Sequence, residues 1–181
     1  MDTSQPRPTS SLRRFLLWTF AGGGLGVAAT LVVVAILNRD PTPSLTPTLF
    51  DAAHQRWNSA APADYDIETR VTGPQPATYR VQVRGGQAQA AWRNGAPLIN
   101  AKTFGTWSVP GMFSTISRDL ESEERRTTGR APPGTPQLIL KAQFDARYNY
   151  PQRYRRIEWG SRRGSDAVTV TWEVVEFKVF Q

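Results

Sequence analysis

The chain has 181 residues, with 22 lysines and arginines against 15 aspartates and glutamates, a formal net charge of +7, and no cysteine. This length suits one modest domain with a short additional segment, and the missing cysteines exclude disulfide bonds, thiol nucleophiles and thiolate metal sites. The single histidine, His54, excludes a histidine-rich metal site and argues against a Ser-His-Asp triad. Hydrophobic residues make up 39% of the chain, which is enough for a packed core.

The first clear feature is an uncharged run over residues 15–37. As a helix rising about 1.5 Å per residue it spans about 34 Å, which is enough to cross a hydrocarbon core of about 30 Å. The run is longer than the apolar region of a signal peptide, and no Ala-x-Ala cleavage pattern follows it. We therefore predict a single-pass transmembrane helix that acts as an uncleaved anchor.

The flanking charges predict the orientation of this helix. Arg13 and Arg14 precede it, so the positive-inside rule keeps residues 1–14 in the cytoplasm as a disordered N-terminus and exports the C-terminal part. The arginine-, alanine- and proline-rich composition is typical of a GC-rich bacterial genome. We thus expect the protein in the inner or cytoplasmic membrane of a bacterium, with its domain in the cell envelope.

Two glycines one helical turn apart, Gly22 and Gly26, lie within the predicted membrane helix. Small residues at this spacing let two helix backbones approach closely, which favours a homodimer. The alternative interpretation is that glycine is simply common in membrane helices.

A proline-rich segment over residues 38–47 separates the membrane helix from the domain at residues 48–181. Such a composition favours an extended spacer. The domain is predicted to open with a helix that ends near residue 58, with Thr48 as its N-cap and Asp51 in capping-box spacing. His54 lies on the apolar side of this helix, so we interpret it as a packing residue.

The period of the apolar residues then changes from that of a helix to two, which indicates strands. The third strand has Ala88, Ala90 and Trp92 as its apolar phase, and Asn94-Gly95 after it is a turn signal. The last strand changes phase after Val174, which indicates either a bulge or a strand buried on both faces. The expected strands cover residues 65–71, 79–83, 88–92, 138–144, 154–159 and 167–180.

A second helix is predicted over residues 109–126, because Ser108 can cap it and Pro110 suits its first turn. The order helix, strands, helix, strands indicates an α+β fold. We predict an antiparallel sheet of five or six strands with two helices packed on one face, preceded by one transmembrane helix.

Several short motifs resemble those of a family of small exported or lipid-anchored bacterial domains that is itself a domain of unknown function. A tryptophan helix leads into a tyrosine strand (Trp57, Tyr65), and residues 144–151, FDARYNYP, look like the family's YDPxxGYP turn. Asn149 stands where the family usually has glycine, and asparagine tolerates positive φ. The resemblance implies a fold and no reaction, and the cysteine pair of many members is missing here.

Carboxylates on the first strand are the candidates for chemistry. Asp64 and Asp66 share one strand face, where they could bind a cation or act as acid and base, or could pair with Arg80 and Arg84 as an ordinary polar face. Asp145 fits an Asx-type turn. We predict no catalytic residue, metal or cofactor, and keep a carboxylate-dependent hydrolase as the alternative function.

A basic and aromatic stretch over residues 147–163 is the strongest surface feature. Arginine forks and flat aromatic rings suit phosphate, carboxylate and sugar contacts, so we predict an anionic envelope polymer, a lipid headgroup or an envelope protein as the partner. A solvated strand face is the competing interpretation, and nucleic acid is not expected for an exported domain. We therefore predict a non-enzymatic binding or structural module, with self-association as a further alternative. The candidate binding residues are Tyr148, Arg153, Tyr154, Arg155, Arg162 and Arg163.

Overall fold

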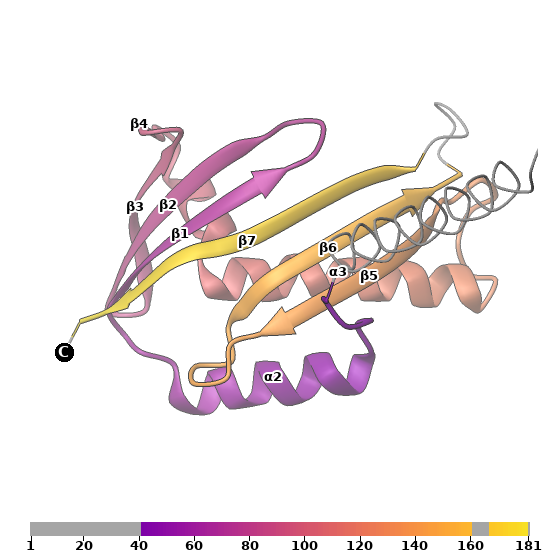
Figure 1. The fold of residues 1–181 in the computed structure, drawn as a ribbon, viewed down its shortest axis with the longest axis horizontal. Helices are drawn as coiled ribbons and strands as arrows, with labels where there is room; N and C mark the ends of the chain where they lie inside the picture. Colours follow the sequence, from indigo (N-terminus) through magenta and orange to yellow (C-terminus); the bar gives the residue numbers. More distant parts are fainter. Residues whose placement is uncertain (1–40, 161–166, 181) are drawn as a thin grey trace, which may run out of the picture. The chain divides into compact units, whose positions relative to one another are not determined.

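The computed structural model describes residues 41–160 and 167–180 (Figure 1). The predicted membrane helix at residues 15–37, with Gly22 and Gly26, lies outside these ranges, as do Arg162 and Arg163. Within the described ranges no helix combines the length and the apolar character needed to cross a membrane. The membrane part of the fold prediction therefore gains no support.

One antiparallel sheet of seven strands forms the centre of the described domain, so the prediction of five or six strands is wrong. The additional strand has only two residues, and it forms because Asn94 and Gly95, with φ of 51° and 82°, fold the chain back onto its predecessor. In space the strands follow the order β4-β3-β2-β1-β7-β6-β5. Their bounds are β1 Tyr65–Thr72, β2 Ala77–Arg84, β3 Gln87–Arg93, β4 Ala96–Pro97, β5 Gln137–Phe144, β6 Pro151–Trp159 and β7 Val168–Val179.

The described residues hold three helices where two were predicted: α2 (Pro47–Ala60), the 3-10 helix η1 (Ala101–Trp107) and α3 (Val109–Thr127). Helix α2 begins earlier than predicted, because Pro47 suits the first helical position and the Thr46 hydroxyl accepts a hydrogen bond from the Leu49 amide at 3.2 Å. Its N-cap is therefore Thr46 and not Thr48.

Helix α3 begins at the predicted residue, where the Ser108 hydroxyl accepts from the Gly111 amide at 3.4 Å. Helix η1 lies against this first turn so closely that a Cβ atom on Gly111 would overlap the carbonyl oxygen of Gly105. A glycine is therefore required where the two helices meet.

Aromatic side chains join both α-helices to one face of the sheet. Trp57 of α2 packs edge-on against Tyr65 of β1 at 5.8 Å between ring centroids, and Phe50 of α2 meets Phe113 of α3 at 5.8 Å. The predicted packing role of His54 is confirmed, since its ring stacks on Phe113 at 4.6 Å. The hydrophobic core therefore lies between these helices and this face.

Two tyrosine hydroxyls tie the sheet to α3. The Tyr65 hydroxyl accepts a hydrogen bond from the Val109 amide at 3.2 Å, which satisfies a backbone donor at the start of the helix. The Tyr154 hydroxyl donates to Asp119 Oδ2 at 2.7 Å. Both tyrosines are almost fully buried, so these polar contacts fix the helix on the sheet from inside the core.

Strand β7 contains a bulge at its phase change. Glu68 of β1 pairs with Glu176, but the next residue, Thr69, pairs with Val174, which leaves Val175 as the extra residue. Val174 is buried and Phe177 packs on the core, whereas Val175 is 39% exposed. Of the two alternatives for this strand, the bulge is therefore the one that occurs.

The residues just before α2 pair with the sheet. The Leu45 amide donates to the Leu140 carbonyl at 2.9 Å, and the Ala142 amide donates to the Pro43 carbonyl at 3.1 Å. Thr42 is 3% exposed. Residues 42–45, which the sequence assigned to the spacer, therefore lie along β5 as part of the folded domain.

Candidate functional site

The sheet face opposite the core is the candidate site, and we call it the outer face. Side chains alternate between the two faces along a strand. Because Ile67 and Thr69 of β1 are buried in the core, their neighbours Asp66, Glu68 and Arg70 belong to the outer face. The described α-helices pack on the other side (Figure 1), so this face carries its own polar surface.

Basic side chains outnumber acidic ones on the outer face. The strand register places Arg70 beside Glu173 of β7, and Glu173 beside Arg153 of β6. In this row, which crosses three strands, two arginines flank one glutamate. Positive charge is therefore present on several strands of the sheet. The basic residues of this face are Arg70, Arg80, Arg84, Lys141, Arg153, Arg155 and Lys178, and the acidic residues are Asp66, Glu68, Glu173 and Glu176.

Asp66 acts as a clamp for two arginines on the neighbouring strand. Its Oδ2 lies 3.1 Å from Arg80 Nη2, and its Oδ1 lies 2.9 Å from Arg84 Nη2. Only 11% of the Asp66 side chain is exposed, whereas the two arginines are 50% and 39% exposed. The carboxylate therefore holds both guanidinium groups in place while part of each faces solvent.

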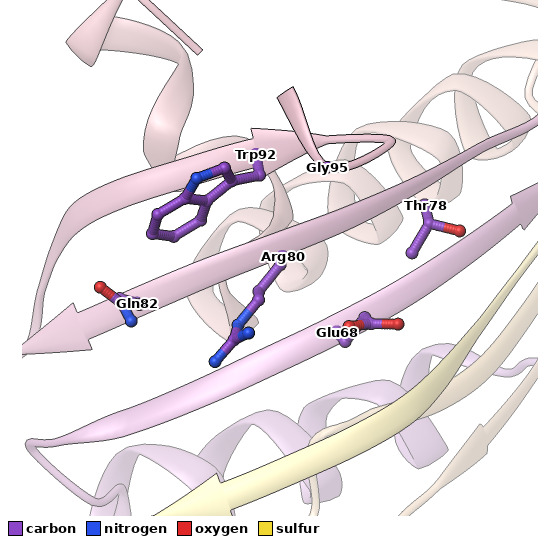
Figure 2. Close-up of a pocket in the computed structure, with 6 residues that line it drawn as sticks. All are labelled: Glu68, Thr78, Arg80, Gln82, Trp92 and Gly95. Carbon is purple, nitrogen blue, oxygen red and sulfur yellow. The ribbon is translucent and has the colours of Figure 1, made fainter. Parts of the chain in front are cut away.

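Beside this clamp the outer face has a hollow of about 340 Å³ across β1, β2 and β3. Figure 2 shows Thr78, Arg80 and Gln82 along β2, between Trp92 on β3 and Glu68 on β1. Glu68 pairs with Arg80 in the register, and Arg80 pairs with Trp92, so the three form one row across the strands. Gly95 completes the lining at the turn after β3.

The polar groups around Trp92 have unused hydrogen-bonding capacity. Trp92 and Glu68 are half-buried, and Gln82 is also partly accessible. Among the described residues, neither the Glu68 carboxylate nor the Gln82 carboxamide has a hydrogen-bond or ion-pair partner. A flat indole ring with a carboxylate, a carboxamide and a guanidinium around it can therefore accept a ligand that offers both a ring face and polar edges.

The predicted site residues of the basic stretch divide between two faces. Arg153 and Arg155 lie on the outer face, where Arg153 Nη2 is 2.6 Å from Glu173 Oε1. Tyr154 between them is 1% exposed and points into the core, where its ring lies 4.5 Å from that of Trp172 in a tilted arrangement. Burial raises the pKa of Tyr154 and the Asp119 carboxylate raises it further, so its hydroxyl stays protonated as a donor.

Tyr148 lies at the turn between β5 and β6, away from these arginines. Its ring packs 5.5 Å from that of Phe177, and the Arg147 guanidinium lies 4.9 Å over it. Asn149 in the same turn has φ of 60°, as expected from its place in the motif. The two tyrosines thus contribute to packing, and only the arginines Arg153 and Arg155 of the described candidates share the outer face.

The other carboxylate candidates have structural partners. Asp64 Oδ1 accepts a hydrogen bond from the Gly85 amide at 2.6 Å. Asp145 Oδ1 accepts from the amides of Arg147 and Tyr148 at 2.9 and 2.6 Å, which is the expected Asx-type turn. In the part of the chain that the structure describes, no three acidic or histidine side chains gather into a potential metal site.

Trp92 is the residue that the sequence interpretation missed. Its period-two phase placed it with Ala88 and Ala90 on the core side, but the register of β3 shifts opposite Gln82 and Val83. Ala91 is consequently the buried residue, and Trp92 turns to the outer face beside Arg80. The sequence held one signal of this shift: Ala90 and Ala91 are adjacent, so either could fill the core position, and the choice decides which face Trp92 occupies.

Comparisons with family models, curated proteins and solved structures found no match to this chain. The resemblance to a domain of unknown function stays a prediction. The functional argument therefore depends on the outer face itself.

Proposed function

We propose that this domain is a non-enzymatic binding module that holds an anionic polymer across the outer face of its sheet. The observation that supports this best is the set of basic side chains on adjacent strands, from Arg80 on β2 to Arg153 on β6. From β2 to β6 the sheet has three intervals between neighbouring strands, of about 4.8 Å each, or roughly 14 Å. A repeating anion fits such a surface better than a small ligand, because its charges recur over that distance.

Two of the four acidic residues of the outer face orient arginines, and the face as a whole stays basic. Glu173 holds Arg153, and Asp66 holds Arg80 and Arg84. A guanidinium has five N–H donors, so an arginine with one carboxylate partner can still bind a second anion through its remaining donors. The exported location expected from the sequence would make a polymer of the cell envelope the natural partner.

Elution from heparin-agarose by salt tests this proposal on the full-length protein. The variant Arg153→Gln with Arg155→Gln should elute at a clearly lower salt concentration than the unmodified protein, since salt screens exposed charges. Arg56→Gln with Arg125→Gln is the matched control, because it removes the same charge from exposed positions on α2 and α3.

Equal shifts for the two double variants would contradict the proposal, because general basicity would then explain the retention. Vesicles containing phosphatidylglycerol serve as a second probe. If these vesicles bind through Arg153 and Arg155 while soluble polymers do not, a lipid surface would replace the polymer as the ligand.

A further inference from the structure

We infer that the hollow around Trp92 is a saccharide subsite, so that the polymer bound by the outer face is an acidic polysaccharide. This inference depends on the proposed function and narrows it to one class of ligand. The hollow of about 340 Å³ lies at the lower end of the usual size of ligand sites, and its lining combines one aromatic ring with several polar side chains.

The arrangement of the lining residues favours a sugar ring. The Trp92 indole offers a flat apolar surface for the C–H face of a pyranose. Arg80 lies directly beside it in the register, and Glu68 is the next residue in that row. Gln82 and Thr78 flank Arg80 along β2 (Figure 2), so the hollow is lined by polar groups together with the indole ring.

The Glu68 carboxylate distinguishes a saccharide from other anionic polymers. It can only accept hydrogen bonds when ionised, and it has no partner among the described side chains. Sugar hydroxyls supply hydrogen-bond donors to this carboxylate, whereas the internal phosphates of a polyphosphate chain offer no donor at neutral pH and would be repelled by it. The hollow therefore matches hydroxyl groups better than bare phosphates.

Arg80 supplies the complementary charge for an acidic sugar. Asp66 holds one of its nitrogens at 3.1 Å, while half of the Arg80 side chain is exposed beside the hollow. A guanidinium in a fixed position is suited to bind a carboxylate of the ligand. Arg70 and Arg153, which lie in another row of the outer face on either side of Glu173, would then meet the acidic groups of further sugar units.

Calorimetric titration of the full-length protein with hexagalacturonate and with a short polyphosphate of similar charge tests this assignment, in buffer without sugar-based detergent. Trp92→Ala should weaken hexagalacturonate binding about tenfold and leave polyphosphate binding unchanged. Trp92→Tyr should restore much of the affinity, because it keeps an aromatic platform. Trp159→Ala is the control, since Trp159 is a tryptophan outside the hollow, 48% exposed at the end of β6.

The outcomes distinguish failure of the saccharide subsite from failure of the proposed function. If hexagalacturonate binds the Trp92→Ala and unmodified proteins equally, the saccharide subsite is wrong while the polymer proposal stands. A similar loss with Trp159→Ala, or an equal loss for both ligands with Trp92→Ala, would also overturn the subsite. If neither ligand binds the unmodified protein, the proposed function fails together with the subsite.

Discussion

Replacing Tyr154 by phenylalanine tests whether this residue of the basic stretch stabilises the fold or contacts the ligand. Its ring is 1% exposed, and its hydroxyl donates to Asp119 Oδ2 at 2.7 Å. Hydrogen bonds to charged groups contribute about 1.5–3 kcal/mol. Asp119 keeps a second partner, Arg156 Nε at 3.3 Å, and 19% of its side chain is exposed. We therefore expect the lower end of that range, a loss of about 1.5 kcal/mol in the free energy of unfolding.

Urea denaturation followed by tryptophan fluorescence measures this loss. For a domain of this size the loss corresponds to a fall of about 5 °C in Tm. The slope of the unfolding free energy against urea concentration should not change. Tyr150→Phe is the matched control: this tyrosine is also buried, but its hydroxyl makes no hydrogen bond with the described residues. Heparin retention of Tyr154→Phe should equal that of the unmodified protein at temperatures where both are folded.

Two outcomes would refute this reasoning. Equal stability of Tyr154→Phe and the unmodified protein would mean that the bond to Asp119 contributes nothing. Weaker heparin retention by the folded Tyr154→Phe protein would mean that Tyr154 takes part in binding, as its place in the basic stretch predicted, and that its role is not packing alone.

Two further predictions concern stability. Gly111→Ala should destabilise the domain by more than about 3 kcal/mol, because its Cβ would overlap backbone atoms of η1, whereas Gly105→Ala should be tolerated. Thermal unfolding followed by circular dichroism compares the two variants. Equal Tm values would contradict the close contact between Gly111 and η1. Burial raises the pKa of Tyr65 to about 12, so stability should fall as the pH rises from about 10 to 12, where the unfolded tyrosine ionises first. The contribution of Tyr65 is at most roughly 2–3 kcal/mol, and unfolding in urea at several alkaline pH values should show a smaller fall for Tyr65→Phe.

The helices and most strands could be predicted because their signals are local. Helix α3 has an apolar stripe and a capping serine within its own sequence, and its start at Val109 was found correctly. In contrast, β4 has only two residues, too few for any periodic pattern. Its existence depends on the turn at Asn94-Gly95 and on pairing with β3, which is information from outside the strand.

The candidate site was predicted only in part for a related reason. The structure places Arg153 and Arg155 on the outer face. Tyr154 between them was predicted to be part of the same patch, although the alternation of side chains along a strand sends it to the core. Trp92 was assigned to the core because it shares the period-two phase of Ala88 and Ala90. A register shift between β2 and β3 reverses this phase and places Trp92 on the outer face. Such shifts are decided by two strands together, so the pattern within one strand cannot reveal them.

The pairing of residues 42–45 with β5 affects how the domain can be recognised. An open sheet edge presents free amide and carbonyl groups, to which another chain can add as a further strand. Here Leu45 bonds to Leu140, and Pro43 to Ala142, so the chain itself occupies this part of the edge. A partner at this place would have to displace the domain's own backbone. Recognition through side chains of the broad sheet surface avoids that cost, and it allows specificity to change by single substitutions without rebuilding the fold.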